Sequence, residues 1–278
     1  MTPLFINFNG EIVLANTSLF SINNRGFRYG DGLFETMRMI KGQLKFADLH
    51  ADRLQRGMKA LKIEGYSQMD AWFFKEKAEE LARRNKIKNG RLRLTVYRDS
   101  DGLYTPLQNK MGWCLEIQAL DEPRYVLNSK GLIADIFTDL TKPCNYLSNI
   151  KTCNSFIYVM AGIYKTQNKL DEVFLLNQEG FLCEASSSNI FILYQNHLYT
   201  PALSEGCVEG VMRQVVIDIA GRIDIPLTEA QIKSDILYEA DEVFITNAIR
   251  GIQSIMGFGV KRYFNELSKK YIEELNKL

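Results

Sequence analysis

Apolar residues recur along this chain with two periods, and each period predicts a different kind of element. Between residues 46 and 63 the apolar side chains fall on one side of a helix, which predicts an amphipathic helix. The same argument predicts helices at 69–85, from 156 onward, from 211 onward and at 261–278. Strands are predicted where β-branched and aromatic residues alternate or cluster between turn signals, at 5–9, 11–14, 91–98, 113–119, 131–137, 173–176, 181–184, 189–194, 197–201 and within 241–252. Asp121-Glu122-Pro123 interrupts this pattern and begins a predicted linker between domains.

Length and composition are those of an ordinary globular protein. The 278 residues are enough for two modest domains or one large one, and 46% of them are hydrophobic and 24% charged. A formal net charge of +1 and the lack of a basic cluster give no reason to expect a nucleic-acid partner. No window has the character of a membrane span. The first residues, MTPLFINFNGEIV, lack the basic head and long apolar run of a signal peptide.

The cysteine and histidine content of the chain limits the disulfides and metal sites that can be expected. The five cysteines form no CxxC pair and leave one over in any disulfide scheme, so we expect reduced thiols in a cytoplasmic protein. Only two histidines are present, His50 and His197, so no histidine-based metal site is expected.

The first candidate for covalent chemistry is Lys151. It stands before Thr152, Asn154 and Ser155, residue types that favour helix starts, and the helix predicted from 156 follows. The positive end of a helix dipole disfavours a charged lysine. A buried neutral lysine is nucleophilic enough to form a Schiff base. The alternative is an exposed lysine ahead of a helix.

Glu184 follows thirty-three residues later, on the returning strand of a hairpin whose predicted turn is 177–180. Alternation puts its carboxylate on the face of Leu182, a mainly apolar surface. A buried carboxylate needs a cationic partner. A protonated pyridine nitrogen would serve, and so would any lysine or arginine of the chain.

Three further segments contain candidate binding residues. Residues 23–36 include three glycines, which need unusual backbone angles or close approach, but the segment lacks the GK[ST] ending of a phosphate loop. A glycine-rich hairpin is the alternative for this segment. His50 and Arg53 share one face of a predicted helix, and an ordinary solvated face is the alternative there. The glycine-containing segment 206–210 opens a helix whose N-terminus is a natural phosphate seat, although many helices begin after glycine.

Taken in order, several separated blocks resemble the class IV aminotransferases. These pyridoxal-phosphate enzymes of fold type IV include branched-chain aminotransferases, D-amino-acid aminotransferases and aminodeoxychorismate lyases. The resemblance extends from about Asn7 to Ile255. The blocks that carry it are R-G-F-R-Y-G-D-G-L-F-E at 25–35, H-x-x-R-L at 50–54, Ile150-Lys151-Thr152, Asp171-Glu172-Val173, E-A-S-S-S-N-I-F at 184–191, G-V-M-R at 210–213 and the Thr246-Asn247-Ala248 block.

The resemblance implies an α/β (α+β) fold of two domains, with pyridoxal 5′-phosphate held between them. A small N-terminal α/β domain would occupy 1–120, a linker 121–130, and a larger C-terminal domain carrying the lysine 131–278. A homodimer is also implied, because the family's active site borrows residues from a second subunit.

The resemblance also implies a role for each site residue. Lys151 would form the Schiff base and shuttle a proton, and Glu184 would pair with the pyridine nitrogen. Arg53 would hold the cofactor phosphate, together with the backbone at Val211 and Met212. Asn247 and Ala248 stand in the last cofactor block, where Ala248 replaces the serine or threonine that is usual in the family. The residues expected around the substrate are Arg28, Tyr29, Phe34, Arg93 and Arg98.

The expected reaction is the transfer of an amino group between an amino acid, either a D-amino acid or a branched-chain L-amino acid, and a 2-oxo acid. The alternative is an aminodeoxychorismate lyase that releases pyruvate. Residues 101–104 lack the P-R-x-H clamp of the D-enzymes, and Phe156 stands where branched-chain enzymes favour tyrosine. Arg28 and Arg98 are extra cations for a substrate carboxylate, or else surface residues. A cofactor-free binding protein is disfavoured by the presence of Lys151, Glu184 and Arg53 together.

Overall fold

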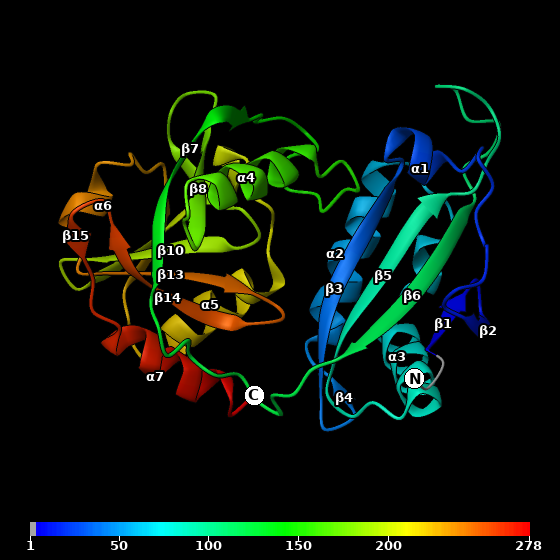
Figure 1. Cartoon of the computed structure of the whole chain (residues 1–278), viewed down its shortest axis with the longest axis horizontal. Coiled ribbons are helices and arrows are strands. Elements are labelled where there is room, and N and C mark those ends of the chain that lie inside the picture. The colour runs from blue at the N-terminus through cyan, green and yellow to red at the C-terminus, as the bar shows by residue number, and fades with distance from the viewer. Residues whose placement is uncertain (1–3) are drawn as a thin grey trace. The chain divides into compact units, whose positions relative to one another are not determined.

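The computed structural model describes residues 4–278, which separate into two compact units (Figure 1). Unit 1 contains the chain up to Pro123 together with residues 150–154, and unit 2 contains 124–149 and 155–278. The lysine segment 150–154, which the sequence-based division places in the C-terminal domain, therefore clusters with unit 1.

Unit 1 is a six-stranded antiparallel sheet with two long helices packed on one face. The strand order is β2-β1-β6-β5-β3-β4. The strands are β1 (Phe5–Phe8), β2 (Glu11–Leu14), β3 (Gly32–Ile40), β4 (Gln43–Leu44), β5 (Gly90–Arg98) and β6 (Met111–Ala119). The helices are α1 (Arg25–Tyr29), α2 (Ala47–Ala60) and α3 (Ala71–Asn85).

The two faces of the unit 1 sheet differ because side chains alternate along each strand. Leu33 and Met37 of β3 and Leu92 of β5 belong to the buried core, which they share with Leu54 and Met58 of α2. The opposite face is called the arginine face below. It carries Phe34, Thr36, Arg38, Arg91, Arg93 and Thr95, with Thr36 paired to Arg93 and Arg38 to Arg91.

Unit 2 is built on a nine-stranded mixed sheet of order β12-β11-β10-β13-β14-β7-β8-β9, with β15 paired to β14. The strands are β7 (Leu132–Lys142), β8 (Glu172–Asn177), β9 (Leu182–Ala185), β10 (Asn189–Tyr194), β11 (His197–Pro201), β12 (Leu227–Ala230), β13 (Glu242–Asn247), β14 (Gly251–Phe258) and β15 (Lys261–Arg262). The helices are α4 (Phe156–Gln167), α5 (Val211–Arg222), α6 (Ile236–Glu239) and α7 (Glu266–Leu275). Ala161 of α4 packs on Phe137 of β7 and on Val173 and Leu175 of β8.

Most predicted helices and strands are confirmed to within a few residues, and the exceptions have local causes. The glycine-rich segment is a short helix, α1, ended by Gly30 at φ 63° and followed by β3, so the hairpin alternative is wrong. The sequence reading missed β3 and most of β14. The predicted helix at 261–278 is wrong at its start, because Lys261 and Arg262 pair with β14 and α7 begins at Glu266.

Two classes of site can be assessed for the described part of the chain. Across residues 4–278 every helix is too short or too polar to cross a bilayer. The same residues contain no cluster of three or more His, Cys, Asp or Glu side chains that could hold a metal ion.

Candidate active site

Lys151 lies on an extended segment at the edge of the unit 1 sheet. The Phe34 N–H donates to the Lys151 carbonyl at 3.1 Å, and the Cys153 N–H donates to the Gly32 carbonyl at 2.8 Å. Leu33 and Thr152 face each other across this bridge. Because Leu33 points into the core, the alternation turns the Lys151 side chain toward the arginine face.

The expectation that Lys151 stands at a helix N-terminus is therefore wrong. The helix α4 begins at Phe156, five residues later, and belongs to unit 2. The surroundings of the lysine are set by β3 instead, through long-range backbone hydrogen bonds that the local sequence does not show.

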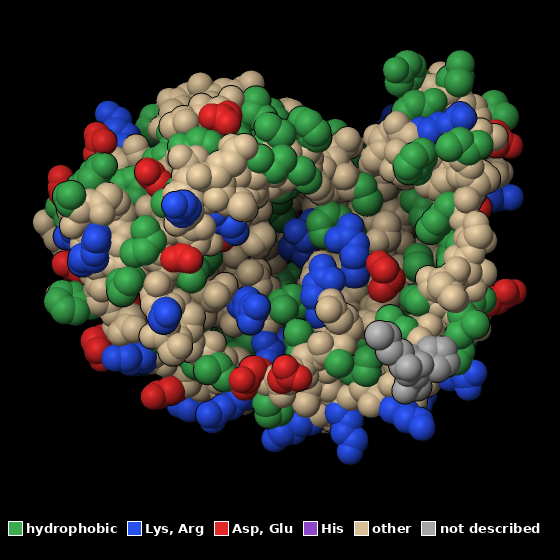
Figure 2. Space-filling view, viewed as in Figure 1, with side chains coloured by type: hydrophobic (Ala, Val, Ile, Leu, Met, Phe, Trp, Pro, Cys, Tyr) green, Lys and Arg blue, Asp and Glu red, His purple; other side chains and the backbone are tan. Residues whose placement is uncertain are grey.

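Phe34 brings two cations together on the arginine face. The Lys151 ammonium lies 4.5 Å from the centroid of the Phe34 ring, and the Arg93 guanidinium carbon lies 3.8 Å from it. Burial lowers the pKa of Arg93. Figure 2 shows lysine and arginine side chains gathered over β3 and β5 on the visible face. Phe34, Arg93 and Lys151, predicted from separate blocks, are thus neighbours in unit 1.

Arg53 is fixed by an acidic residue on the core side of β3. It donates from Nε to Glu35 Oε1 at 2.8 Å and from Nη2 to Oε2 at 2.5 Å. His50, one helical turn earlier on α2, contacts Oε2 through Nδ1 at 2.6 Å. Burial acts to raise the pKa of Glu35, but Arg53 and His50 outweigh it and lower this pKa to about 2. The carboxylate stays ionised and holds the guanidinium plane in one orientation.

Arg98, expected near the substrate, is engaged by other groups of unit 1. It donates from Nε to Asp31 at 3.0 Å, from Nη1 to Asn109 at 2.5 Å and from Nη2 to the Leu61 carbonyl at 2.7 Å. The side chain is buried. These bonds tie β5 to the segment after α2, so the geometry favours a structural role for Arg98 over a substrate-binding one.

Arg25 is a structural arginine that the sequence reading missed. It lies in the same glycine-rich block as Arg28, but it is buried and donates to Asp31 at 2.8 Å and to the Leu103 carbonyl at 2.5 Å. Arg28 is exposed on α1, and Tyr29 is half-buried. The block therefore contains one arginine that holds the 99–107 loop and one whose side chain faces solvent.

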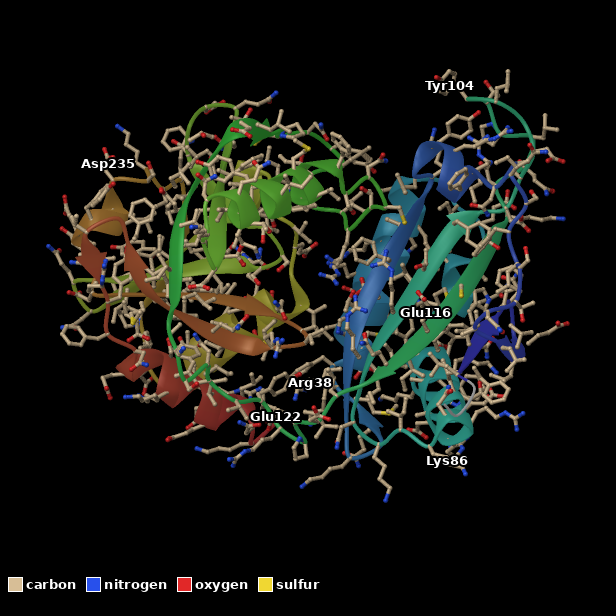
Figure 3. All side chains as sticks on the ribbon, in the orientation of Figure 1. Arg38, Lys86, Tyr104, Glu116, Glu122 and Asp235 are labelled. Carbon is tan, nitrogen blue, oxygen red and sulfur yellow. The ribbon has the colours of Figure 1, made fainter. Side chains whose placement is uncertain are left out.

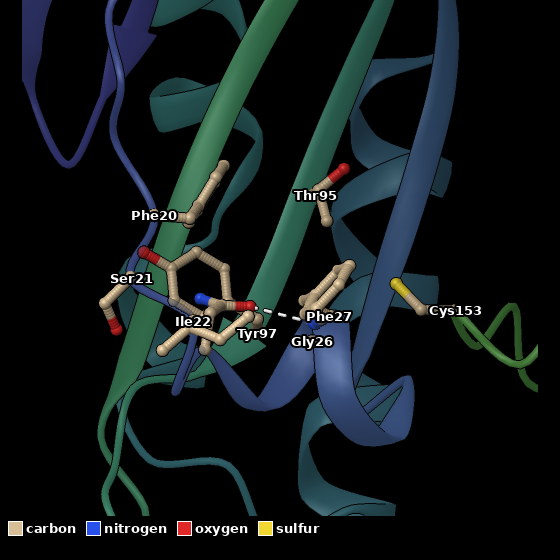
Figure 4. A pocket seen from close by; sticks show the side chains of 9 residues that line it. Phe20, Ser21, Ile22, Gly26, Phe27, Thr95, Tyr97 and Cys153 are labelled. Atoms are coloured by element: carbon tan, nitrogen blue, oxygen red, sulfur yellow. Dashed lines mark hydrogen bonds between the residues drawn. The ribbon is translucent and has the colours of Figure 1, made fainter.

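A cavity of about 430 Å³ opens in unit 1 beside Cys153 (Figure 4). Its lining is mainly apolar, with Phe20, Ile22, Phe27 and Tyr97 as the largest side chains. Cys153 is two residues from Lys151 on the same side of their extended segment. The apolar wall therefore begins close to the lysine.

In unit 2, Glu184 is buried on β9 and receives three hydrogen bonds. The Lys142 ammonium, at the end of β7, and the Tyr158 hydroxyl of α4, at 2.7 Å, both contact Oε1. The Val208 N–H donates to Oε2 at 2.9 Å. Burial and the charge of Glu184 raise the pKa of Tyr158, so this residue is a neutral donor. The predicted burial of Glu184 and its need for a cation are both confirmed.

The segment that leads into α5 is anchored on both sides. Asn149 accepts the Glu209 N–H through its carbonyl at 3.1 Å and donates from Nδ2 to the Cys207 carbonyl at 2.7 Å. Asn189 Nδ2 donates to the Val208 carbonyl at 2.8 Å. A side chain at Gly210 would be excluded, because its Cβ would lie 2.0 Å from Asn189 Oδ1. These contacts fix the path of residues 207–210, which run from the contact of Val208 with Glu184 to the start of α5.

The first turn of α5 is suited to an anion. The helix begins at Val211 after Gly210, and no side chain caps its first amides. Val211 and Met212 are buried, so they can offer a ligand only their backbone N–H groups. Uncapped amides at the positive end of a twelve-residue helix favour a phosphate group.

Asn247 and Ala248 form the turn after β13. Asn247 donates from Nδ2 to the Ser188 hydroxyl at 2.9 Å and accepts the Arg250 N–H at 2.8 Å. The Ala248 carbonyl accepts the Tyr125 hydroxyl at 3.3 Å. Thr246 pairs with Asn189, so this turn adjoins the residue that shapes the α5 entry.

Two residues of the unit 2 site, Lys142 and Tyr158, were missed by the sequence reading. Lys142 is the last residue of β7, just before Pro143, and Tyr158 lies in the first turn of α4. No motif marks either of them. The only signal was the general requirement that a buried Glu184 have a cation beside it.

Comparison with known proteins places these features in context. The chain matches the family described as Amino-transferase class IV over residues 32–257. It is 29% identical to a putative branched-chain-amino-acid aminotransferase of Methanocaldococcus jannaschii, over 97% of this chain and 94% of that protein. It is 27% identical to the aminodeoxychorismate lyase of Bacillus subtilis, over 88% and 83% respectively. It is 28% identical to a D-alanine aminotransferase of Listeria monocytogenes, over 86% and 82%.

Solved structures show the same fold. A branched-chain aminotransferase from Thermoproteus uzoniensis with norvaline superposes with a TM-score of 0.87 at 24% identity, covering 99% of this chain and 94% of that one. An aminotransferase from Brucella abortus bound to the cofactor PLP superposes with a TM-score of 0.85 at 20% identity, covering 98% and 97%. The predicted α/β architecture is confirmed.

Proposed function

Because the chain belongs to the class IV aminotransferases, enzymes that use pyridoxal 5′-phosphate, we propose that it transfers an amino group between an amino acid and a 2-oxo acid. The amino acid is a D-amino acid or a branched-chain L-amino acid. The observation that carries this proposal is the link from the buried Glu184 carboxylate through Val208 to the uncapped start of α5. The hydrogen bond from Val208 thereby joins an acceptor for a ring nitrogen on β9 to a seat for a phosphate at the start of α5.

The residues of unit 2 fit the cofactor at two of its polar groups. Glu184 has three donors, so one of the roughly four acceptor positions of a carboxylate is still open for a ring N–H. The backbone amides at Val211 and Met212 would hold the phosphate, and the lack of a side chain at Gly210 lets Asn189 pack against the start of the helix. When bound, pyridoxal 5′-phosphate supplies an electron sink for the bonds around the amino carbon. Glu184 would hold a proton at the ring nitrogen.

The residues of unit 1 fit the remaining roles. Lys151 is the lysine we assign to the covalent link with the cofactor, and afterwards its Nζ would carry the proton that the reaction moves. Arg53, held in one plane by Glu35, would bind the phosphate. Arg93, on the same face as Lys151, would meet a substrate carboxylate. Arg28 is a second candidate for that carboxylate.

The apolar cavity suits the side chain of the substrate. It begins at Cys153, close to Lys151, and its lining is largely aromatic and aliphatic. A substrate with a carboxylate at one end and an apolar side chain at the other would match Arg93 on one side and this wall on the other. That pairing supports an apolar amino acid as donor.

Assembly into a homodimer is part of the proposal. Large apolar side chains are exposed around α1 and the 99–107 loop, including Phe27, Leu103 and Tyr104, the last at 89% exposure. Figure 2 shows hydrophobic side chains gathered at that end of unit 1, and Figure 3 marks Tyr104 at the tip of the loop. Exposed apolar patches of this kind favour protein contacts. Light scattering on the purified protein is expected to give the mass of two chains, and a monomer would contradict this part of the proposal.

The location proposed for this enzyme is the cytoplasm. All five cysteines are free thiols, and three of them, Cys114, Cys183 and Cys207, are buried. A protein with only unpaired cysteines suits a reducing compartment.

The test is a half-reaction. The protein loaded with pyridoxal 5′-phosphate is mixed with single D- and L-amino acids, and the absorbance of the cofactor and the 2-oxo acid formed are measured. We expect at least one amino acid to convert the cofactor to its amine form with one equivalent of oxo acid. Lys151→Ala protein is the control and should not turn over. A cofactor-loaded enzyme that reacts with no amino acid would contradict the transaminase assignment.

A lyase is the second candidate, because the arginine face carries both Arg91 and Arg93 on β5. Two cations suit a substrate with two carboxylates, such as aminodeoxychorismate. The relative from Bacillus subtilis is a lyase of this kind by name. Pyruvate release from aminodeoxychorismate, without any half-reaction with amino acids, would favour this candidate.

A further inference from the structure

Lys142 is the one lysine among the buried side chains of residues 4–278. Lysine is rarely buried unless it has a partner, and here the partner is the Glu184 carboxylate. The ammonium also lies 5.5 Å from the centroid of the Tyr158 ring. Because the burial of such a group is costly, its position calls for an explanation.

The three donors on Glu184 divide unequally between its oxygens. Oε1 accepts from both the Lys142 ammonium and the Tyr158 hydroxyl, whereas Oε2 accepts from the Val208 N–H alone. A carboxylate offers about two acceptor positions per oxygen. The open position is therefore on Oε2, the oxygen held by the segment that leads to α5.

We propose that Lys142 is a positioning residue for the cofactor ring nitrogen: it keeps the buried Glu184 ionised and turned so that Oε2 is left to accept that nitrogen. The inference rests on the proposed function, since it assigns the ring nitrogen to Glu184. Without a fixed cation, the carboxylate would be buried and uncompensated until the cofactor arrived. With Lys142 in place, the Glu184 carboxylate is already oriented to accept the ring nitrogen before the cofactor binds.

Few other groups could control the charge of Glu184. Burial raises the pKa values of Tyr158, Cys183 and Cys207, to about 12 for Cys207, so all three are neutral near pH 7. Burial also raises the pKa of the Cys144 thiol, which lies beyond the end of β7. Arg213 of α5 is paired with Glu229. Within residues 4–278, Lys142 is thus the only charged side chain that contacts Glu184.

Removing the charge of Lys142 should therefore change how pH affects cofactor binding. In a Lys142→Met protein, Glu184 would be buried without a counter-ion, which favours the neutral carboxyl form over the carboxylate in the ligand-free site. The carboxyl proton must leave before Glu184 can accept the ring N–H. Binding by the variant should weaken relative to wild type as the pH falls, by up to about tenfold per pH unit.

The experiment measures the dissociation constant of pyridoxamine 5′-phosphate by equilibrium dialysis from pH 6 to pH 8.5. This probe binds without a covalent link, so Lys151 does not enter the result. We expect the ratio of the Lys142→Met constant to the wild-type constant to rise as the pH falls. Lys142→Arg keeps the charge and should give a flat ratio near one. The control variant Lys77→Met removes a half-buried, ion-paired lysine of α3, and its ratio to wild type should also be flat and near one.

A flat ratio for Lys142→Met, or a Lys142→Arg protein that behaves like it, would overturn the inference. If Lys142→Met does not fold, the double variant Lys142→Met/Glu184→Gln decides. Recovery of folding supports the inference, since the uncompensated carboxylate is then gone, and failure to recover contradicts it. Wild-type protein that binds no pyridoxamine 5′-phosphate would instead refute the proposed function, so the two failures are distinguishable.

Discussion

Arg53 on α2 donates hydrogen bonds to both carboxylate oxygens of Glu35 on β3, from Nε at 2.8 Å and from Nη2 at 2.5 Å. This two-point contact fixes the plane of the guanidinium group. The arginine that we assign to the cofactor phosphate therefore needs little reordering when the ligand binds. We also expect the pair to stabilise unit 1.

The first prediction concerns Glu35 and pH. Its pKa is lowered from 4.5 to about 2, so its contribution is present above pH 4.5 and is lost as the pH falls toward 2. At about 1.4 kcal/mol per pKa unit, the contribution is about 3 kcal/mol. Urea unfolding of wild type and Glu35→Gln should differ by roughly this amount at pH 7 and converge below pH 4. Glu79→Gln, an exposed partner of Arg83, is the control and should differ little at any pH.

The second prediction concerns the covalent link. Borohydride reduction of the cofactor-loaded protein, followed by peptide mapping, should place the pyridoxyl group on Lys151. Lys142 is the internal control, because it is buried beside Glu184 and should stay unlabelled. A label on any lysine other than Lys151 would refute the assignment.

The third prediction separates the role of Glu184 in turnover from its role in folding. Glu184→Gln removes a charge-assisted bond worth about 1.5–3 kcal/mol, so turnover should fall by roughly tenfold to over a hundredfold. Stability should also fall, because Lys142 is left buried without a counter-ion. Adding Lys142→Met should recover much of the stability and none of the turnover. Normal turnover in the single variant would mean that the ring nitrogen has another partner.

The fourth prediction concerns Arg98. Replacing it with alanine removes the bonds to Asp31, Asn109 and the Leu61 carbonyl, which should lower the free energy of unfolding by about 3 kcal/mol. Arg28→Ala should leave that free energy nearly unchanged, because Arg28 is exposed on α1. Thermal and urea unfolding provide the measurement. If Arg98→Ala is as stable as wild type and only its substrate affinity suffers, Arg98 belongs to the substrate site after all.

The fifth prediction concerns Arg93. If it meets the substrate carboxylate, Arg93→Ala should weaken substrate binding by about 1.5–3 kcal/mol, which is roughly tenfold to over a hundredfold in the half-saturation constant. The absorbance of the bound cofactor should not change. Arg83→Ala, an exposed arginine of α3, is the control. Unchanged half-saturation in the Arg93 variant would shift the assignment to Arg28.

Local patterns in the sequence were enough for the elements and for the family. The helical period over 46–63 predicts α2, and the alternation over 91–98 predicts β5 with Arg91 and Arg93 on one face. The order of the separated blocks indicates the class IV fold and nominates Lys151, Glu184 and Arg53. The apolar neighbours of Glu184 also predict its burial and its need for a cation. Each of these depends on short local patterns or on the order of such patterns along the chain.

Only the tertiary structure decided which groups meet. Lys151 lies on the edge of β3 because residues 32–34 pair with 151–153, and Lys142 faces Glu184 because β7 and β9 flank the same strand, β8. The bonds of Arg98 to Asp31 and Asn109 favour a structural role over the expected place beside the substrate. Lys142 and Glu184 are 42 residues apart and Leu33 and Thr152 are 119 apart, so the register of the sheet strands selects these partners. A local pattern can show that a buried charge needs a partner, but the register of distant strands determines which residue supplies it.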